Sequence, residues 1–243
     1  MEKRLDGQLG AFFPSAWPAL LARISEIDEF KGWWVGRFDP PPAYLSGLRK
    51  KTIALSAIAS VGIDWTGLPL RRDELSPAVS PARAEEIRRA SAASYAQLLK
   101  AVFDGHPEIP FSREVVLKFH SDLLRYSPHD QGHRGSYRSS SDRSAFFLRK
   151  SVESIALRPS DPGSIEAEMD SLLAWTNSRL GVAGFHPLVV VAGFLLEFLA
   201  IRPFAAANGR TSRLLTNLLL LRCGYAYLPY ASLEKVIADR NAE

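Results

Sequence analysis

Arg210 and Arg213 stand three residues apart at the start of a predicted helix, a spacing that places both guanidinium groups on one helix face. A helix N-terminus offers unpaired backbone N–H groups and the positive end of the helix dipole, and arginine binds phosphate oxygens through paired hydrogen bonds. The pattern therefore predicts an anion site made by Asn208, Gly209, Arg210 and Arg213. On spacing alone, an N-cap asparagine followed by a solvated arginine face explains the same residues equally well.

Predicted helices make up most of the chain and must position this site. Proline breaks and the spacing of apolar residues predict helices over residues 16–24, 43–60, 82–103, 112–125, 164–180, 186–201, 209–222 and 232–241. Two short apolar runs, 145–148 and 154–157, predict one β-hairpin. We therefore expect an all-α helical bundle with one hairpin, in which residues 1–79 form an N-terminal helical region and residues 80–243 form the main domain.

Composition excludes several classes of protein. The 243 residues are 47% hydrophobic and 23% charged, as in globular proteins, and the net charge of +4 comes from arginines too dispersed for a nucleic-acid surface. The single cysteine, Cys223, excludes a disulfide framework. The apolar stretch 188–201 is too short to span a membrane, and the N-terminus lacks the apolar run of a signal peptide. A cytoplasmic protein without membrane or nucleic-acid contacts is predicted.

The segment 202–213 resembles the signature of the Fic family, HPFx(D/E)GN(G/K)RxxR. Most members of that family transfer AMP from ATP to a hydroxyl group of a protein. The matching residues are Pro203, Phe204, Asn208, Gly209, Arg210 and Arg213. The resemblance implies the Fic fold, a nucleotide held by Asn208, Gly209, Arg210 and Arg213, and ATP and Mg²⁺ as cofactors.

Further motifs extend the resemblance in both directions. Gly135-Ser136-Tyr137-Arg138 is similar to the family's GxYR, and His186-Pro187 opens the helix before the signature. In the family, the hairpin after GxYR is a flap that docks the target protein. By resemblance, the flap of this chain includes Ala145, Phe146 and Phe147.

Three positions depart from the signature. Arg202 stands where the family has its catalytic histidine, and a guanidinium stays protonated, so it cannot act as a general base. Ala206 stands at the acidic position that holds Mg²⁺ and offers no oxygen ligand, which predicts no metal site in this loop. Ala207 replaces the first glycine of the phosphate cradle, where its methyl group opposes a positive φ.

Many family members carry an inhibitory helix with the motif (S/T)xxxE(G/N), whose glutamate pairs with the second signature arginine. The equivalent here is expected within residues 60–70. One register places Thr66 at the glutamate position and another places Leu68 there. Asp64, four residues after Ser60, is the only acid within reach.

Two functions remain open from the sequence. The first is an AMP-transferase impaired by its substituted loop, and the second is a non-catalytic Fic-fold module that binds a nucleotide or a protein. The run Ala205-Ala206-Ala207 also allows a loop altered by engineering in an active parent. The target protein stays unidentified, and a homodimer is left open.

Three other groups of residues have structural predictions. His120, on the apolar face of its helix, is predicted to be a core residue, and His186 is predicted to cap the helix that it opens. Cys223 is predicted to be buried and inert. The aromatic residues Phe30, Trp33 and Trp34 are predicted to pack between the N-terminal helices and the core.

Overall fold

The computed structural model describes residues 17–66, 81–127, 130–141, 146–149, 154–157, 159–180 and 184–240. Its α-helices are α2 (Trp17–Arg37), α3 (Pro42–Thr66), α4 (Pro81–Gly105), α5 (Arg113–Leu123), α6 (Ile165–Leu180), α7 (Pro187–Ile201), α8 (Asn208–Arg222) and α9 (Leu233–Arg240). Two short 3₁₀ helices, η2 (Pro162–Ser164) and η3 (Leu228–Tyr230), join longer elements. The predicted all-α fold is therefore confirmed.

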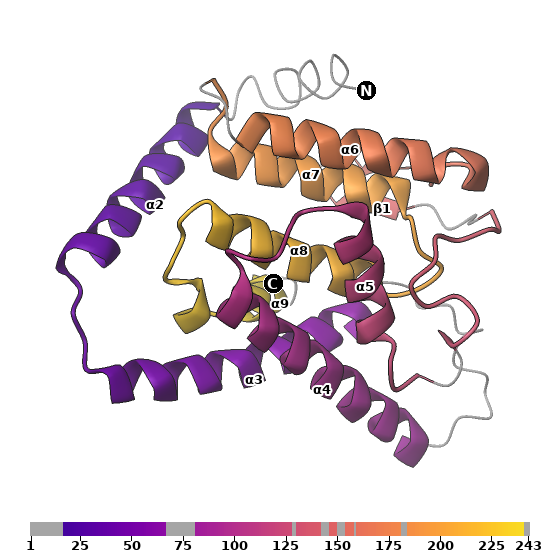
Figure 1. The fold of residues 1–243 in the computed structure, drawn as a ribbon, viewed down its shortest axis with the longest axis horizontal. Coiled ribbons are helices and arrows are strands. Elements are labelled where there is room, and N and C mark those ends of the chain that lie inside the picture. The colour runs from indigo at the N-terminus through magenta and orange to yellow at the C-terminus, as the bar shows by residue number, and fades with distance from the viewer. Residues whose placement is uncertain are drawn as a thin grey trace.

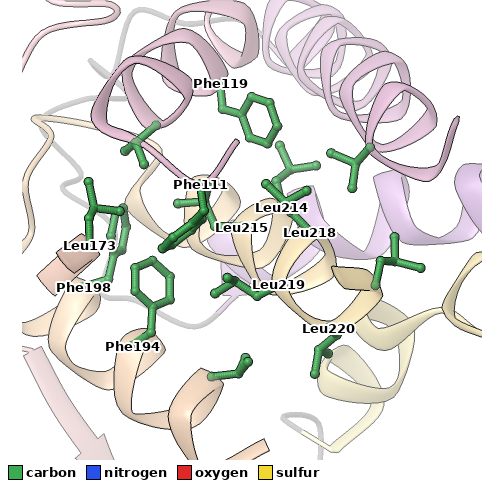
Figure 2. Packing of buried hydrophobic residues seen from close by; sticks show 14 of the residues in the cluster. Phe111, Phe119, Leu173, Phe194, Phe198, Leu214, Leu215, Leu218, Leu219 and Leu220 are labelled. Atoms are coloured by element: carbon green, nitrogen blue, oxygen red, sulfur yellow. The ribbon is translucent and has the colours of Figure 1, made fainter. Parts of the chain in front are cut away.

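Helix α8 is the centre of the molecule, and the other helices pack around it (Figure 1). Every residue from Thr211 to Leu221 is buried, because leucines on all sides of this helix can be covered only by neighbours on all sides. Figure 2 shows Leu214, Leu215, Leu218 and Leu219 facing the rings of Phe111, Phe119, Phe194 and Phe198. Helices α3, α4, α5 and α7 all contact α8.

Helix α3 packs against α4 and α9 as well as α8, so an N-terminal helix lies directly on the central helix. The sequence predicted that this helix ends at Ser60, but it continues to Thr66. Gly62 lies inside the helix, where its lack of a side chain weakens the propensity without stopping the helix. The extra turn matters because it carries Asp64. The division into residues 1–79 and 80–243 stays a prediction.

Helix α2 crosses one end of the bundle, at the left of Figure 1. It is longer than the predicted 16–24 and continues through Phe30, Trp33 and Trp34 to Arg37. Lys31 Nζ donates to the carbonyl oxygen of Cys223 at the end of α8 (2.7 Å), where a cation suits the helix dipole. Cys223 is half-buried rather than fully buried, and burial raises the pKa of its thiol.

The predicted aromatic packing between α2 and the core is confirmed. The Phe30 ring meets Tyr227 edge-on with centroids 5.0 Å apart, and the Trp34 ring stacks on Tyr230 at 5.4 Å. Trp33 contacts Phe38 and stays partly exposed.

Strands β1 (Phe146–Arg149) and β2 (Ser154–Leu157) pair in antiparallel orientation, with Phe146 opposite Leu157 and Phe147 opposite Ala156. Ala145, which the flap prediction also includes, lies outside the described residues. Among the helices described, none combines the length and apolar character that crossing a bilayer requires.

Candidate functional site

The loop between α7 and α8 is held in a tight turn by its own side chains. Asn208 Oδ1 accepts from the Phe204 amide (3.0 Å) and Asn208 Nδ2 donates to the Phe204 carbonyl oxygen (2.7 Å). Asn208 is buried, so its amide closes the loop. Two residues of the loop have left-handed backbone: Arg202, the C-cap of α7, with φ 48°, and Ala207, the N-cap of α8, with φ 57°. The loop thus keeps a positive φ at the position where the resemblance places a glycine.

His120 on α5 packs against this loop. It is fully buried, as predicted, and its ring stacks on Phe204 with centroids 3.8 Å apart. Its Nδ1 accepts from the Gly135 amide (2.9 Å), which requires the neutral tautomer protonated at Nε2. Burial lowers the pKa of His120 to about 4. A neutral imidazole therefore joins the signature loop to the GxYR segment.

Arg138 ties the same loop to both ends of the hairpin. Its Nε donates to the Arg202 carbonyl oxygen (2.7 Å), and its Nη1 donates to the carbonyl oxygen of Ser140, before β1 (2.9 Å). Its Nη2 donates to the carbonyl oxygen of Ser160, after β2. The backbone N–H of Arg138 adds a bond to Pro203 (2.9 Å). This buried guanidinium therefore fixes the strained Arg202 backbone and the base of the hairpin together.

The predicted arginine pair does come together, and a carboxylate joins it. Arg210 Nε donates to Asp64 Oδ2 (2.9 Å), and Arg213 Nη2 donates to Asp64 Oδ1 (2.6 Å). Arg213 also binds Ser60, with Nε on the hydroxyl and Nη2 on the carbonyl oxygen, both at 2.8 Å. Burial alone would lower the pKa of Arg213, but Asp64 and the other acidic groups around it raise it on balance. Arg213 therefore stays charged although it is buried.

Gly209 lets the carboxylate approach the N-terminus of α8. A Cβ atom at this position would lie 2.9 Å from Asp64 Oδ1 and 3.1 Å from Arg213 Nη1, so the ends of these two side chains would have to shift. The Asp64 carboxylate thus sits where the helix dipole, the first backbone N–H groups and two arginines favour an anion. The geometry suits an anionic oxygen group, and in this structure the Asp64 carboxylate occupies that place.

Two positions of this loop lack the groups that the family signature has for metal binding and base catalysis. Ala206 stands at the family's metal-ligand position, and no cluster of three or more His, Cys, Asp or Glu side chains occurs in the described part of the chain. Oxygen ligands are what Mg²⁺ requires. Position 202 carries a guanidinium group, which has N–H donors and no acceptor for the proton of a hydroxyl group.

The sequence predicted the pair of Arg210 and Arg213, the loop of small residues before them and Asp64 as the acid within reach. It did not predict the buried groups that lie behind these residues. Asp64 makes the contact with Arg213, whereas the register candidate Leu68 lies outside the described residues. His186 caps α7 as predicted, accepting from the Leu188 amide and contacting Asp28 of α2 at 2.7 Å. Glu234 on α9 was missed, although an acid one turn before apolar residues near the end of the chain is a weak signal of a buried carboxylate.

Comparisons with known proteins agree with this geometry. A model of the Fic/DOC family matches residues 110–220. The protein adenylyltransferase Fic of Aedes aegypti is 42% identical over 67 residues, which cover 28% of this chain and 13% of that protein. The corresponding protein of Drosophila erecta is 40% identical over the same length, again covering 13% of the relative. The match thus spans a small part of these curated relatives.

Solved structures show the same fold. A Fic family protein from Desulfovibrio desulfuricans G20 aligns with a TM-score of 0.57 and 24% identity, covering 94% of this chain and 64% of that one. Fic-1 from C. elegans aligns with a TM-score of 0.59 and 19% identity, covering 92% of this chain and 67% of that one. The family match contains α5, the hairpin, α6, α7 and most of α8, and the signature arginines meet at its end. Residues 110–220 therefore match the Fic/DOC family model, and the chain shares the fold of these solved structures.

Proposed function

We propose that this Fic-domain chain binds the phosphate groups of a nucleotide, ATP by family resemblance, at the N-terminus of α8, and that it transfers AMP to protein hydroxyl groups weakly or not at all. One observation carries the binding half of the proposal. Arg210 and Arg213 converge on two oxygens of a single carboxylate beside Gly209, which is the arrangement that an anionic oxygen group needs. In this conformation Asp64 stands in the place of the ligand.

The loop supports the second half of the proposal. Losing a general base costs roughly 10²- to 10⁴-fold in rate, and Arg202 replaces the family's base. Ala206 removes the metal ligand as well, so the residues present stabilise bound phosphate without activating an attacking hydroxyl group. The remaining residues of the site can still bind an anion.

Titration calorimetry tests the binding half of the proposal. ATP is titrated, with and without Mg²⁺, into the native chain and into an Asp64→Asn variant, which removes the competing charge and keeps the shape. We expect binding to Asp64→Asn to be at least about tenfold tighter than to the native chain, because the arginines lose their internal partner. Mg²⁺ should not strengthen binding, because the loop has no acidic ligand for the ion and the ion neutralises part of the phosphate charge that the arginines recognise.

Controls separate this effect from a general change of charge. Asp104→Asn removes an acid that pairs with Lys100 and Arg49 at the surface, and it should leave ATP binding unchanged. Adding Arg213→Gln to Asp64→Asn should abolish the gain. No heat with Asp64→Asn in either condition would overturn nucleotide binding.

The second candidate is a protein-binding module without nucleotide. It is favoured by the two-stranded sheet of β1 and β2, because each strand pairs with a single partner among the described residues and leaves an outer edge for an added strand. Failure of ATP to bind any variant, together with strand-dependent binding of a protein target, would favour this candidate.

A further inference from the structure

A second carboxylate lies behind the arginine pair, on α9. Glu234 is 1% exposed, and its Oε1 accepts from the Tyr95 hydroxyl (2.6 Å) and from Asn217 Nδ2 (2.8 Å). Tyr95 and Asn217 are buried as well. Burying a carboxylate is costly unless hydrogen bonds and a nearby positive charge compensate it. The hydrogen bonds are provided by Tyr95 and Asn217, and the positive charge must come from a neighbour.

Arg213 is the cation coupled to this buried group, since the Glu234 charge helps to raise the pKa of Arg213. Asn217 Nδ2 donates both to Glu234 and to the Arg213 carbonyl oxygen (3.0 Å), one helical turn away. On the other side, the Ser60 hydroxyl accepts from Arg213 Nε and is also a hydrogen-bond partner of Tyr95. Burial and the Glu234 charge raise the pKa of Tyr95 well above its ordinary value, so the phenol remains a donor. Arg213 and Glu234 are thus linked along two short buried paths.

The two carboxylates near Arg213 differ in how easily they can leave. The Asp64 side chain is 24% exposed and approaches from the last turn of α3. Glu234 is enclosed between α4, α8 and α9 by its two hydrogen bonds. When an external anion replaces Asp64, Glu234 remains in position. Two arginines and two carboxylates make the cluster formally neutral, and two arginines with one carboxylate give a charge of only +1.

We propose that Glu234 is a fixed internal counter-ion of Arg213, which holds the guanidinium charged and in place and limits how tightly the α8 N-terminus binds a multivalent anion. This inference rests on the proposed phosphate site and identifies what sets its affinity. Glu234 is a positioning residue, because it acts through Arg213. Its two effects have opposite signs, since it stabilises the arginine and repels the ligand.

Glu234→Gln in the Asp64→Asn background tests the repulsion. Glutamine keeps an oxygen that accepts from Tyr95 and Asn217 but removes the charge. We expect ATP and inorganic pyrophosphate to bind about tenfold more tightly to this double variant than to Asp64→Asn alone. Removing one negative charge near the bound anion changes the binding free energy by about this much in a medium of intermediate dielectric. The affinity should also fall more steeply with salt. Structural damage to the site would weaken ATP binding, so tighter binding cannot result from such damage.

Three controls isolate the charge. Glu234→Asp keeps the charge and shortens the side chain, and it should give no gain. Tyr95→Phe removes one hydrogen bond and keeps the carboxylate, and it should also give no gain. Asp239→Asn removes a charge from the exposed face of the same helix, where Asp239 pairs with Lys235, and it should change nothing. Equal gains from Asp239→Asn and Glu234→Gln would overturn the inference.

The role of Glu234 can also be measured without a ligand, even if the anion site binds nothing. The Asp64→Asn and Glu234→Gln variants form a double-mutant cycle read by denaturant unfolding. If both carboxylates compensate Arg213, the double variant leaves a buried charge alone, and its unfolding constant should rise at least about fivefold beyond the product of the single effects. Independent effects in the cycle would overturn the role of Glu234. No binding by Asp64→Asn together with a coupled cycle would overturn only the proposed phosphate site.

Discussion

Single side chains decide what the signature loop can do. Asp64 binds Arg210 and Arg213 through different oxygens, so one carboxylate satisfies both guanidinium groups. Asn208 is bound to Phe204, which makes it the clamp of the loop in this conformation. Its predicted contact with a nucleotide stays a prediction. The loop differs from the family signature because the histidine at position 202 and the acidic residue at position 206 are absent. Its shape does not account for the difference.

The buried imidazole of His120 predicts a pH dependence of stability. Burial lowers its pKa from 6.5 to about 4, so the unfolded chain binds one more proton than the folded chain between these values. The contribution is fully present above pH 6.5 and is lost as the pH falls to about 4, with a total of about 3 kcal/mol.

Unfolding by denaturant at a series of pH values measures this term. His120→Gln keeps an oxygen for the Gly135 amide and removes the titration. The stability difference between the native chain and His120→Gln should therefore shrink as the pH is lowered from 7 to 4. Two parallel stability curves would show that His120 does not carry the term.

At the scale of elements, apolar periodicity was sufficient for the central helices and insufficient for the N-terminal ones. Helix α7 is apolar except for Glu197, and α8 carries six leucines between Leu214 and Leu221; the bounds of both helices agree with prediction to within one residue. Helix α2 extends far beyond its prediction, because its second half is held by Lys31 and by aromatic contacts across the bundle end. Long-range contacts of this kind have no local sequence signal.

The residues of the candidate site likewise divide into those predictable from local sequence and those positioned by long-range packing. The arginine pair and the helix start are local and were predictable from spacing. The contact of Asp64 with Arg210 spans 146 positions, and that of Glu234 with Tyr95 spans 139, so both depend on how α3, α4 and α9 pack around α8. Asp64 was recognised as the acid within reach, but the predicted end of its helix at Ser60 hid its orientation.

The N-terminus of α8 carries local strain that a substitution can release. Ala207 has φ 57°, which costs an alanine about 1 kcal/mol relative to glycine. Ala207→Gly should therefore raise the free energy of unfolding by up to about 1 kcal/mol, measured by denaturant titration. Ala205→Gly is the matched control, since Ala205 is not among the described positive-φ residues, and it should give no gain. Equal effects of the two exchanges would contradict the assignment of strain to Ala207.

At the scale of the whole molecule, α8 receives functional groups from three sides. Helix α3 brings Ser60 and Asp64, α9 brings Glu234, and the loop before α8 brings Phe204, which binds Asn208 at the start of α8. These contacts come from both the region before residue 80 and the region after it. A site assembled in this way depends on the packing of the entire bundle.

Repair of the loop should therefore restore chemistry only when the anion site is also open. We expect a chain with Arg202→His, Ala206→Asp, Ala207→Gly and Asp64→Asn to label itself or an added protein from ATP in the presence of Mg²⁺, followed with labelled nucleotide. The same chain with Arg202 left unchanged should be slower by roughly 10²- to 10⁴-fold, because it lacks the general base. No labelling by the repaired chain would mean that the loss of transfer extends beyond this loop.

The bonds of Arg138 give the hairpin a mechanical property. The carbonyl groups before β1 and after β2 are pinned to the same guanidinium as the carbonyl of Arg202. One side chain thus joins the chain segments that lead into and out of the hairpin to the backbone of Arg202, so a substitution of Arg138 would release all three carbonyl groups at once.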